Sequence, residues 1–474
     1  MNNHIEDWIS NTFKTNSTFD VINPYSQEVI SSLPEMGRVE TLDALDILEK
    51  GYQDWDNQNI SYRAELLCKW ADLLEENIQE LSSLLTKEQG KPIGAATGEL
   101  LWAISSIREN ANTAKNTHGY TPIQSDPSLQ TIVTKQSLGI IAVITPWNFP
   151  LFISLSTISG AIAVGNVALC KTSEETPLAV AAAISLAYKA GIPKDVIQYL
   201  TAKSPQEIGD TICQDHRVRM LGFTGSTLTG KKLYEKSSSN VKKLLLELGG
   251  NSPFVVYDDC DIEKAVNDAA SIKFSNCGQI CVNANRFLVH EKVYDQFIEK
   301  FTNLARQQIV GDGLNSKTTM GPMNNLKVLE KVNRLIEDAV SNGAKLLYGG
   351  KLIKEGSLLF SPTVLTNATK DMDIFKTEIF GPVAVFYKFS DNDDVLEIAN
   401  DTEYGLAAYC YTKDLSKAIN FGKKVQAGKV GINTTASSGG PFGGFKESGI
   451  GRSSGHVNPL DIYCETKSID INIS

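Results

Sequence analysis

Between residues 139 and 250, short continuous apolar segments alternate with segments of helical periodicity, and Gly, Pro, Ser or Thr separates one from the next. Apolar runs of this kind are typical of parallel strands that crossover helices bury on both faces. The pattern predicts strands at residues 139–145, 167–171, 196–201, 219–224 and 243–248. It also predicts helices near residues 151–164, 178–190, 205–213 and 226–237. The alternation of strands and helices indicates the α/β fold class. With right-handed crossovers, the five strands should form a doubly wound parallel sheet.

The turns that follow these strands are the expected place for a ligand, since doubly wound sheets bind ligands beyond the carboxyl ends of their strands. Three such turns favour a nucleotide, at residues 146–150, 171–174 and 225–227. The segment 223–232 nearly matches a P-loop, but Lys232 stands where a bound Mg²⁺ needs a hydroxyl. We interpret it instead as a strand-to-helix turn in which Gly225 and Ser226 face a phosphate. A tight turn without a ligand would show the same glycine.

A second unit of alternating strands and helices begins after residue 250 and continues to about residue 430. Its first helix starts at about Ile262, for which Asp261 is the predicted N-cap. Two further segments, 121–134 and 468–474, have the alternation of isolated strands. They could pair with each other or with another subunit.

Cys281 lies between a predicted helix and a predicted strand, among glycine, glutamine and asparagine. This setting offers donors for a developing oxyanion and room for a substrate carbonyl to reach sulfur. The chain has eight cysteines, however, and a free cysteine is usually a small buried hydrophobe, so the thiol alone decides nothing. Glu247, at the end of an apolar strand, is either a general base with a pKa raised by burial or a glutamate paired with a lysine such as Lys243. Asn148, held between two prolines, is either a positioned oxyanion donor or an exposed turn residue.

Composition excludes several classes of function. A net charge of -10 and a pI near 5.2 provide no basic surface for a nucleic acid, which is not an expected partner. No apolar run approaches the roughly 18 residues of a membrane helix, and the first residues lack a signal-peptide pattern, so we expect a cytoplasmic protein with no membrane partner. The cysteines show neither a disulfide framework nor paired zinc-ligand spacing, so we expect no metal. Five histidines, none in a motif-like setting, weaken the case for a Cys-His hydrolase.

Six motifs occur in an order and spacing that resembles the aldehyde dehydrogenase superfamily over essentially the whole chain. They are Pro146-Trp-Asn-Phe-Pro150, Phe223-Thr-Gly-Ser226, Leu246-Glu-Leu-Gly-Gly-Asn251, Gly278-Gln-Ile-Cys281, Glu378-Ile-Phe-Gly-Pro382 and Pro441-Phe-Gly-Gly-Phe-Lys446. The resemblance implies oxidation of an aldehyde to a carboxylic acid. Cys281 would attack the aldehyde, the Asn148 amide and the Cys281 backbone N–H would hold the oxyanion of the thiohemiacetal, and hydride would pass to nicotinamide. Glu247 would then activate the water that hydrolyses the thioester, so the acyl group would not go to coenzyme A.

The resemblance also implies a nicotinamide cofactor. Lys171 and Glu174 would contact the adenosine ribose, Ser226 the pyrophosphate and Glu378 the nicotinamide ribose. The full cofactor-binding set expected is Pro146, Trp147, Lys171, Ser173, Glu174, Gly225, Ser226, Glu378 and Phe380. Because a carboxylate accepts both ribose hydroxyls but repels a 2′-phosphate, Glu174 favours NAD. NADP stays open if Glu174 turns away, since Lys171 and Ser173 would then serve a phosphate.

Within the superfamily the chain is most similar to the succinate-semialdehyde dehydrogenase branch. Members that bind a substrate carboxylate typically have two arginines at positions that read Ser156 and Ser275 here. Losing both guanidiniums would remove charge-assisted bonds of roughly 1.5 to 3 kcal/mol each. Either another cation, such as Lys273 or Arg286, replaces them, or the substrate is a neutral aliphatic or aromatic aldehyde.

The resemblance further implies three structural parts and assembly as a homodimer or homotetramer. The parts are a dinucleotide-binding domain (1–119 and 139–247), a catalytic domain (248–446) and a small β oligomerisation element (120–138 and 456–474). Two rivals from other classes stay open: a thiol esterase that uses Cys281 without nicotinamide, and a binding protein that kept the fold. The presence of Cys281, Glu247 and Asn148 argues against the second rival. Redox regulation through Cys277 is not implied, since spacing alone does not show whether two sulfurs meet.

Overall fold

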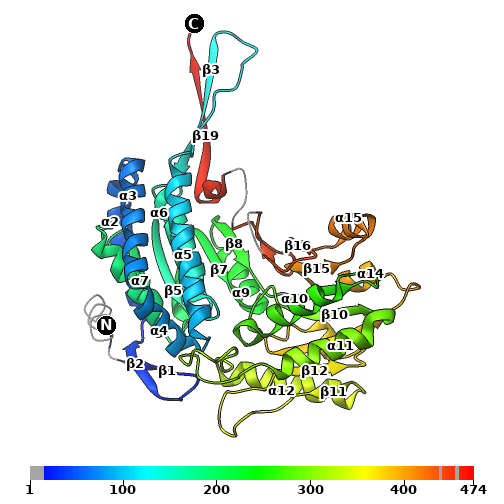
Figure 1. Cartoon of the computed structure of the whole chain (residues 1–474). Coiled ribbons are helices and arrows are strands. Elements are labelled where there is room, and N and C mark those ends of the chain that lie inside the picture. Colours follow the sequence, from blue (N-terminus) through cyan, green and yellow to red (C-terminus); the bar gives the residue numbers. More distant parts are fainter. Residues whose placement is uncertain (1–14, 16, 437–439, 454–457) are drawn as a thin grey trace.

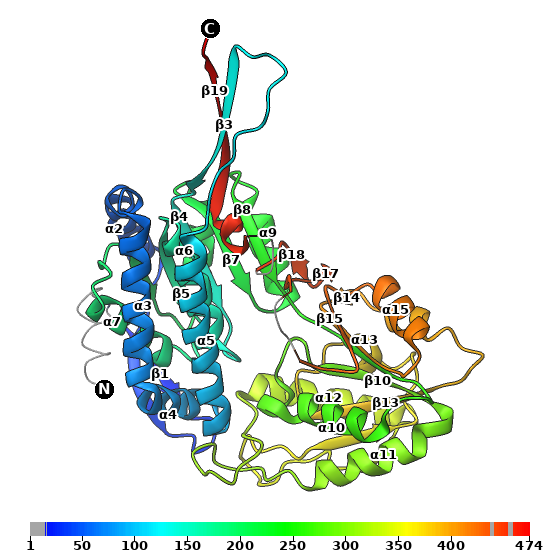
Figure 2. The ribbon, with the colours of Figure 1, turned by 45° about the horizontal axis from the view of Figure 1, so that its top comes forward.

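The computed structural model describes residues 15, 17–436, 440–453 and 458–474. Two sheets covered by helices lie side by side, and a two-stranded arm projects from the first (Figure 2). The predicted α/β fold class is confirmed. Parts of the three predicted domains, at 1–14, 16, 437–439 and 456–457, lie outside the described residues.

The first sheet contains the five predicted parallel strands, and each end lies within one residue of its predicted position. They are β4 (Ile140–Thr145), β5 (Val167–Thr172), β6 (Ile197–Leu200), β7 (Val218–Thr224) and β8 (Lys243–Glu247). The order across the sheet is β18-β8-β7-β4-β5-β6. The added strand, β18 (Gly449–Ile450), pairs antiparallel with β8 and brings a distant part of the chain to the sheet edge. No pattern predicted β18, because a strand of this length has no periodicity.

Helices cover both faces of the first sheet. The predicted crossover helices are α6 (Pro150–Ala163), α7 (Leu178–Lys189), α8 (Gln206–Gln214) and α9 (Thr227–Ser237). They follow an N-terminal set made of β1 (Thr18–Ile22), β2 (Val29–Pro34), α2 (Arg38–Asp56), α3 (Ile60–Glu76), α4 (Ile78–Gln89) and α5 (Ile93–Ala114). Among the helices of the described residues, none combines the length and apolarity that crossing a bilayer requires.

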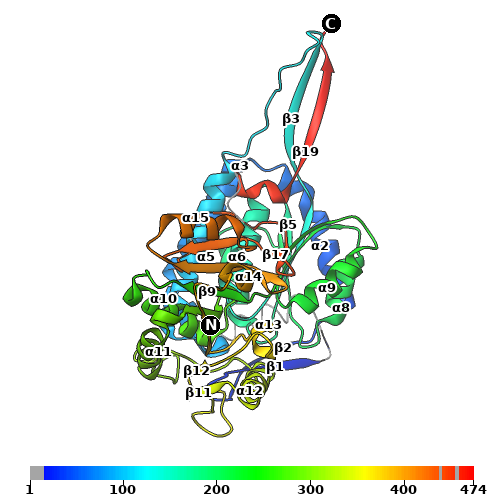
Figure 3. The ribbon, with the colours of Figure 1, turned by 90° about the vertical axis from the view of Figure 1, so that its right-hand side faces the viewer.

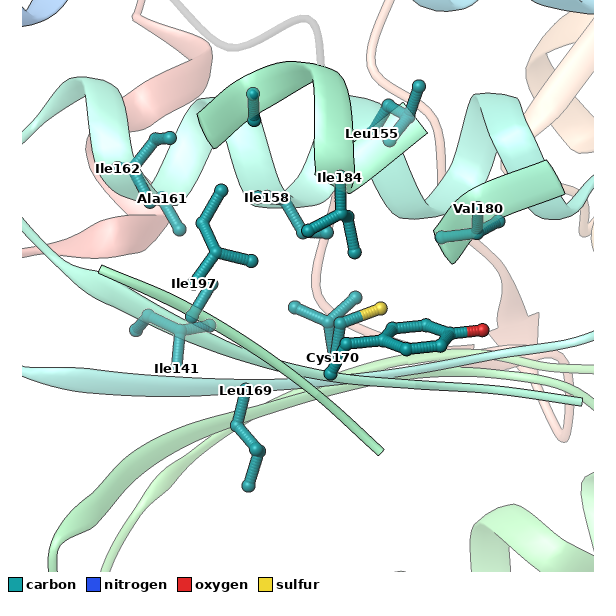
Figure 4. Close-up of a cluster of buried hydrophobic side chains, with 14 of the residues drawn as sticks. Ile141, Leu155, Ile158, Ala161, Ile162, Leu169, Cys170, Val180, Ile184 and Ile197 are labelled. Carbon is teal, nitrogen blue, oxygen red and sulfur yellow. The ribbon is translucent and has the colours of Figure 1, made fainter. Parts of the chain in front are cut away.

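The layer between α6, α7 and the first sheet is mainly apolar (Figure 4). Ile158 of α6 and Ile184 of α7 lie over Ile141 of β4 and Cys170 of β5, and all four side chains have no exposed surface. Full burial of an aliphatic side chain of this size stabilises the fold by about 1.5 to 3 kcal/mol. This packing fixes the height at which the parallel strands end, and therefore the position of the turns that follow them.

The second sheet has the order β11-β12-β13-β10-β9-β15-β16, and only β11 runs antiparallel to its neighbour. Its strands are β9 (Ser252–Val256), β10 (Ala284–His290), β11 (Lys345–Tyr348), β12 (Thr363–Thr366), β13 (Val383–Phe389), β15 (Ala407–Tyr411) and β16 (Lys429–Ile432), with a separate small pair of β14 (Tyr404–Gly405) and β17 (Phe445–Lys446). Its helices are α10 (Ile262–Phe274), η1 (Ser275–Gly278), α11 (Glu291–Arg306), α12 (Leu326–Ser341), α13 (Asp373–Lys376), α14 (Val395–Asn400) and α15 (Leu415–Lys424). The predicted cap is confirmed, because the Asp261 carboxylate accepts a hydrogen bond from the Lys264 backbone N–H at 3.1 Å.

The arm consists of β3 (Leu129–Ser137) and β19 (Cys464–Asn472), which pair antiparallel over their whole length. It extends away from the body of the molecule and ends near the C-terminus (Figures 1 and 3). The predicted segments 121–134 and 468–474 contain these strands only in part, since β3 starts eight residues later than predicted and β19 starts four residues earlier. The two strands pair with each other within one chain. The short helix η2 (Pro459–Tyr463) precedes β19 and anchors the arm, because Leu460 and Tyr463 belong to the hydrophobic core of the first sheet.

Candidate active site

The chain turns sharply between α10 and Cys281. Asn276 and Cys277 have positive φ angles of 49° and 56°, and Gly278 follows with φ of 73°. At Gly278 a Cβ atom would lie 2.1 Å from the carbonyl oxygen of Gly381, so only glycine fits. Left-handed backbone at a non-glycine residue costs on the order of 1 to 3 kcal/mol and persists only where the surroundings enforce it. The surrounding structure therefore enforces this turn. The turn brings Cys281, the candidate nucleophile, next to the 378–382 loop.

Cys281 is partly exposed, and its backbone packs against the turn that follows β8. A Cβ atom at Gly250 would lie 2.2 Å from the Cys281 carbonyl oxygen, which explains why that turn ends in glycine. Burial raises the pKa of the Cys281 thiol to about 12, and the charges of Glu378 and Glu247 act in the same direction. Near neutral pH the side chain is therefore a thiol, and it needs a base to become the reactive thiolate.

Glu247 ends β8 with its carboxylate buried, at 6% residue exposure. Among the described residues, neither carboxylate oxygen has a hydrogen-bond partner of ordinary geometry. Burial raises the pKa of Glu247 to about 8, while Arg452 and the nearby Ser453 hydroxyl lower it. The alternative pairing with Lys243 is wrong, because the Lys243 ammonium donates to the Cys464 carbonyl at 2.6 Å. An unpartnered carboxylate with this pKa can take a proton from water near neutral pH.

Asn148 is buried between the two sheets. Its side-chain Nδ2 donates to the Gln279 carbonyl at 3.0 Å, and its backbone carbonyl accepts from Asn276 Nδ2 at 3.1 Å. The exposed-turn alternative is therefore wrong. Both bonds join Asn148 to the Cys281 segment, and the second Nδ2 hydrogen stays available to an oxyanion.

The turns at the carboxyl ends of β5 and β7 lie where a dinucleotide is expected. Ser226 caps α9, since its hydroxyl accepts from the Thr229 backbone N–H at 3.3 Å. Lys171 is buried, and its Nζ lies 3.5 Å from the Glu174 carboxylate. The Ser173 hydroxyl donates to the same carboxylate at 3.3 Å. Glu174 therefore turns toward Lys171 and Ser173 rather than away from them.

A second group of predicted cofactor residues lies near Cys281. Glu378 is held by the Gly250 backbone N–H, which donates to its carboxylate at 2.9 Å, and burial raises the pKa of Glu378. Phe380 has a φ of 60°, and its ring meets that of Trp147 edge to face at 5.5 Å between centroids. Pro146 directly follows β4 and precedes Trp147.

These residues fit a nicotinamide dinucleotide. Glu174 and Glu378 offer a carboxylate for each ribose, and the Gly225–Ser226 turn offers the N-terminus of α9 for the pyrophosphate. The aromatic rings of Trp147 and Phe380 lie near Glu378, which would face the nicotinamide ribose. When bound there, the cofactor would accept hydride from the substrate.

Comparison with known proteins decides the family. The model of the aldehyde dehydrogenase family matches residues 8–469. The chain belongs to the aldehyde dehydrogenase family. This protein therefore oxidises an aldehyde, members of its family use NAD or NADP, and the resemblance inferred from the six motifs is confirmed.

Individual relatives support a narrower similarity. A succinate semialdehyde dehydrogenase of Acinetobacter baylyi is 41% identical over 449 residues, covering 94% of this chain and 92% of its own. An NADP(+) succinate-semialdehyde dehydrogenase of Escherichia coli is 40% identical over 456 residues, covering 96% and 94%. The crystal structure of a succinate-semialdehyde dehydrogenase from Burkholderia pseudomallei superposes with a TM-score of 0.94 at 40% identity, covering 96% and 95%.

Of the two cations considered as replacements for the missing arginines, Arg286 is engaged elsewhere and Lys273 is buried. Arg286 is buried and donates to backbone carbonyls, including those of Asn251 and Ala399, so its guanidinium ties β10 to the end of α14. Lys273 has no exposed surface, and burial lowers its pKa to about 7. Neither side chain has surface exposed to solvent.

Other residues noted in the sequence have structural positions. Cys277 is buried with its sulfur 3.6 Å from that of Met323. Lys446 donates to the carbonyls of Asn400, the last residue of α14, and of Thr402. Within the described ranges, no group of three or more His, Cys, Asp or Glu is arranged to hold a metal ion.

Sequence reasoning missed one buried group beside Asn148. Lys91 and Glu99 form an ion pair there with almost no exposed surface. The only signal was a lysine between Gly90 and Pro92, which by itself looks like an ordinary turn.

Proposed function

We propose that this enzyme oxidises a small aldehyde through a covalent thioester on Cys281 and releases the free carboxylic acid. The supporting observation is the unpartnered, buried Glu247 carboxylate, whose charge is near enough to raise the pKa of the Cys281 thiol. Sulfur attacks the carbonyl carbon as the thiol gives its proton to solvent water, which reaches the partly exposed Cys281. The new oxyanion takes hydrogen bonds from Asn148 Nδ2 and the Cys281 N–H. A nicotinamide dinucleotide bound at the site would accept hydride from the thiohemiacetal, and a thioester would remain on Cys281. Glu247 then takes a proton from water as the oxygen attacks, and the C–S bond breaks.

We propose NAD as the preferred cofactor. The Glu174 carboxylate lies against Lys171 and Ser173, so it partly neutralises the cation that a 2′-phosphate would need and adds a repelling charge. Two relatives are named as NADP enzymes, so NADP is the alternative cofactor to be measured.

Replacing Glu174 with serine should shift preference from NAD toward NADP. Removing the carboxylate frees Lys171 for a phosphate, and the ratio of kcat/KM for NADP to that for NAD should rise by roughly 10- to 100-fold. Rates with each cofactor at a saturating aldehyde concentration measure this ratio. Glu175→Ser serves as the neighbouring control. An unchanged ratio in Glu174→Ser would remove Glu174 from cofactor selection.

Two substrate classes are proposed. Succinate semialdehyde comes first, because close relatives carry that name. A neutral aliphatic or aromatic aldehyde is the second candidate, and a specific observation favours it: Ser156 and Ser275 replace the expected arginines, while Arg286 and Lys273 are engaged or buried.

Introducing arginine at Ser275 should improve turnover of an anionic aldehyde. Ser275 is exposed beside the Cys281 turn, so a guanidinium there can reach a substrate carboxylate, and KM for succinate semialdehyde should fall roughly tenfold. Ser275→Gln is the matched control without charge. If both variants behave alike, charge at this position does not select the substrate.

The proposed function is tested by following reduced nicotinamide with NAD and NADP across succinate semialdehyde, neutral aliphatic aldehydes and aromatic aldehydes. Acid formed in equal amount to reduced cofactor supports the proposal. Turnover of esters without any cofactor-dependent aldehyde oxidation would favour a thiol esterase instead.

We propose further that two or four copies assemble through the arm. Among the described residues, the outer edge of β3 is bridged only at Val133, by Tyr120, and the ribbon exposes apolar side chains, namely Leu129, Ile132, Ile469, Ile471 and Ile473. The three domain boundaries and the cytoplasmic location expected from the sequence stay predictions.

A further inference from the structure

A buried ion pair lies under the segment that carries Asn148. Lys91, just after α4, and Glu99, in the second turn of α5, are in contact through Nζ and Oε2, and their side chains are 1% and 0% exposed. Burying two charges costs desolvation free energy, and apolar residues of similar size often replace such a pair without loss of stability. Stability alone is therefore a weak explanation for this pair.

Both charges are directed at one short stretch of backbone. Glu99 Oε1 accepts hydrogen bonds from the backbone N–H groups of Leu151 and Phe152, at 2.9 and 3.2 Å, in the first turn of α6. A carboxylate at this end of a helix is also favoured by the helix dipole. Lys91 Nζ donates to the Asn148 carbonyl at 2.7 Å. The pair therefore holds the backbone on each side of the turn 148–152.

The same carbonyl links this turn to the nucleophile. The oxygen of Asn148 also accepts from Asn276 Nδ2, and Asn148 Nδ2 donates to the Gln279 carbonyl. Lys91 thus contacts a peptide group that also bonds to the Cys281 segment. A shift of this peptide would move the Asn148 amide relative to Cys281.

We propose that Lys91 and Glu99 are positioning residues for the oxyanion donor: they fix the Asn148 backbone so that its amide faces the carbonyl oxygen of a substrate on Cys281. The inference rests on the proposed roles of Asn148 and Cys281. Neither Lys91 nor Glu99 touches the reacting atoms. Their effect should pass entirely through Asn148.

The test is a double-mutant cycle between the pair and Asn148. The variant Lys91→Met/Glu99→Gln removes both charges together and so avoids an unpaired buried charge. We expect kcat to fall about 10- to 100-fold with little change in KM, since a small misplacement of a reacting group is sufficient for such a loss. Asn148→Ala should lose roughly 100- to 1,000-fold, and adding the pair variant to it should cause almost no further loss. Lys69→Met, which breaks an exposed pair with Glu65, is the control and should behave as wild type.

Two further measurements separate this proposal from general destabilisation and from the proposed function. Alkylation of Cys281 by iodoacetamide forms no oxyanion, so its rate should be unchanged in the pair variant. Hydrolysis of p-nitrophenyl acetate does form one at Cys281 and needs no nicotinamide, so it should fall with the pair variant even if no aldehyde is turned over. Losses that multiply in the cycle, a pair variant with wild-type kcat, or slowed alkylation together with a lowered melting temperature would each overturn the proposal.

Discussion

Replacing Cys281 with alanine should abolish aldehyde oxidation, with kcat reduced by at least about 10⁴-fold. The structure offers no second nucleophile at this point in the described chain, since the nearest cysteine in sequence, Cys277, is buried against Met323. Without sulfur no thiohemiacetal forms, and hydride has no tetrahedral carbon to leave. Formation of reduced nicotinamide measures the loss. Binding of NAD, followed by quenching of protein fluorescence, should persist in the variant.

Cys277→Ala is the matched control, because it removes a sulfur four positions away. Its cost should appear in thermal stability, through the cavity left beside Met323, and not in kcat. If Cys281→Ala kept substantial activity, or if Cys277→Ala lost all activity in a folded protein, the assignment of the nucleophile would be wrong.

The first sheet could be predicted closely because its signals are local. Each strand is a continuous apolar run, and each crossover helix begins or ends at residues that interrupt periodicity. The turns after β5 and β7 then follow from topology, which is why Glu174 and Ser226 could be placed at the sheet edge. The catalytic residues were suggested by the six family motifs and not by hydrophobic periodicity.

The contacts that depend on distant segments could not be predicted. Arg286 looked like a free cation, yet it satisfies carbonyls at the end of α14, more than a hundred residues away in sequence. The Lys91–Glu99 pair could not be predicted, because a lysine in a turn and a glutamate in a helix are usually solvated. Burial of a charged group is a property of the assembled fold, and a single sequence shows only the residue type.

Replacing Glu247 with glutamine should separate the two halves of the reaction. Glutamine keeps the size of the side chain but cannot take a proton from water, so acylation of Cys281 should still yield a burst of reduced nicotinamide close to one per active site. Steady-state turnover should then fall by about 10²- to 10⁴-fold, because hydrolysis of the thioester has lost its base. Stopped-flow measurement of the burst and the following rate tests both expectations. An equal loss of burst and steady state would instead make Glu247 necessary for activating Cys281.

The pH dependence of the wild type sharpens this prediction. Burial raises the pKa of Glu247 to about 8, and only the ionised carboxylate can act as a base. Where hydrolysis limits turnover, kcat should therefore rise as pH increases through 8 and level off above it, since the ionised fraction grows in that direction. The residual steady-state rate of Glu247→Gln should lack this rise. If the variant kept the same pH profile, the titrating group would lie elsewhere, and the proposed hydrolytic role of Glu247 would fall with it.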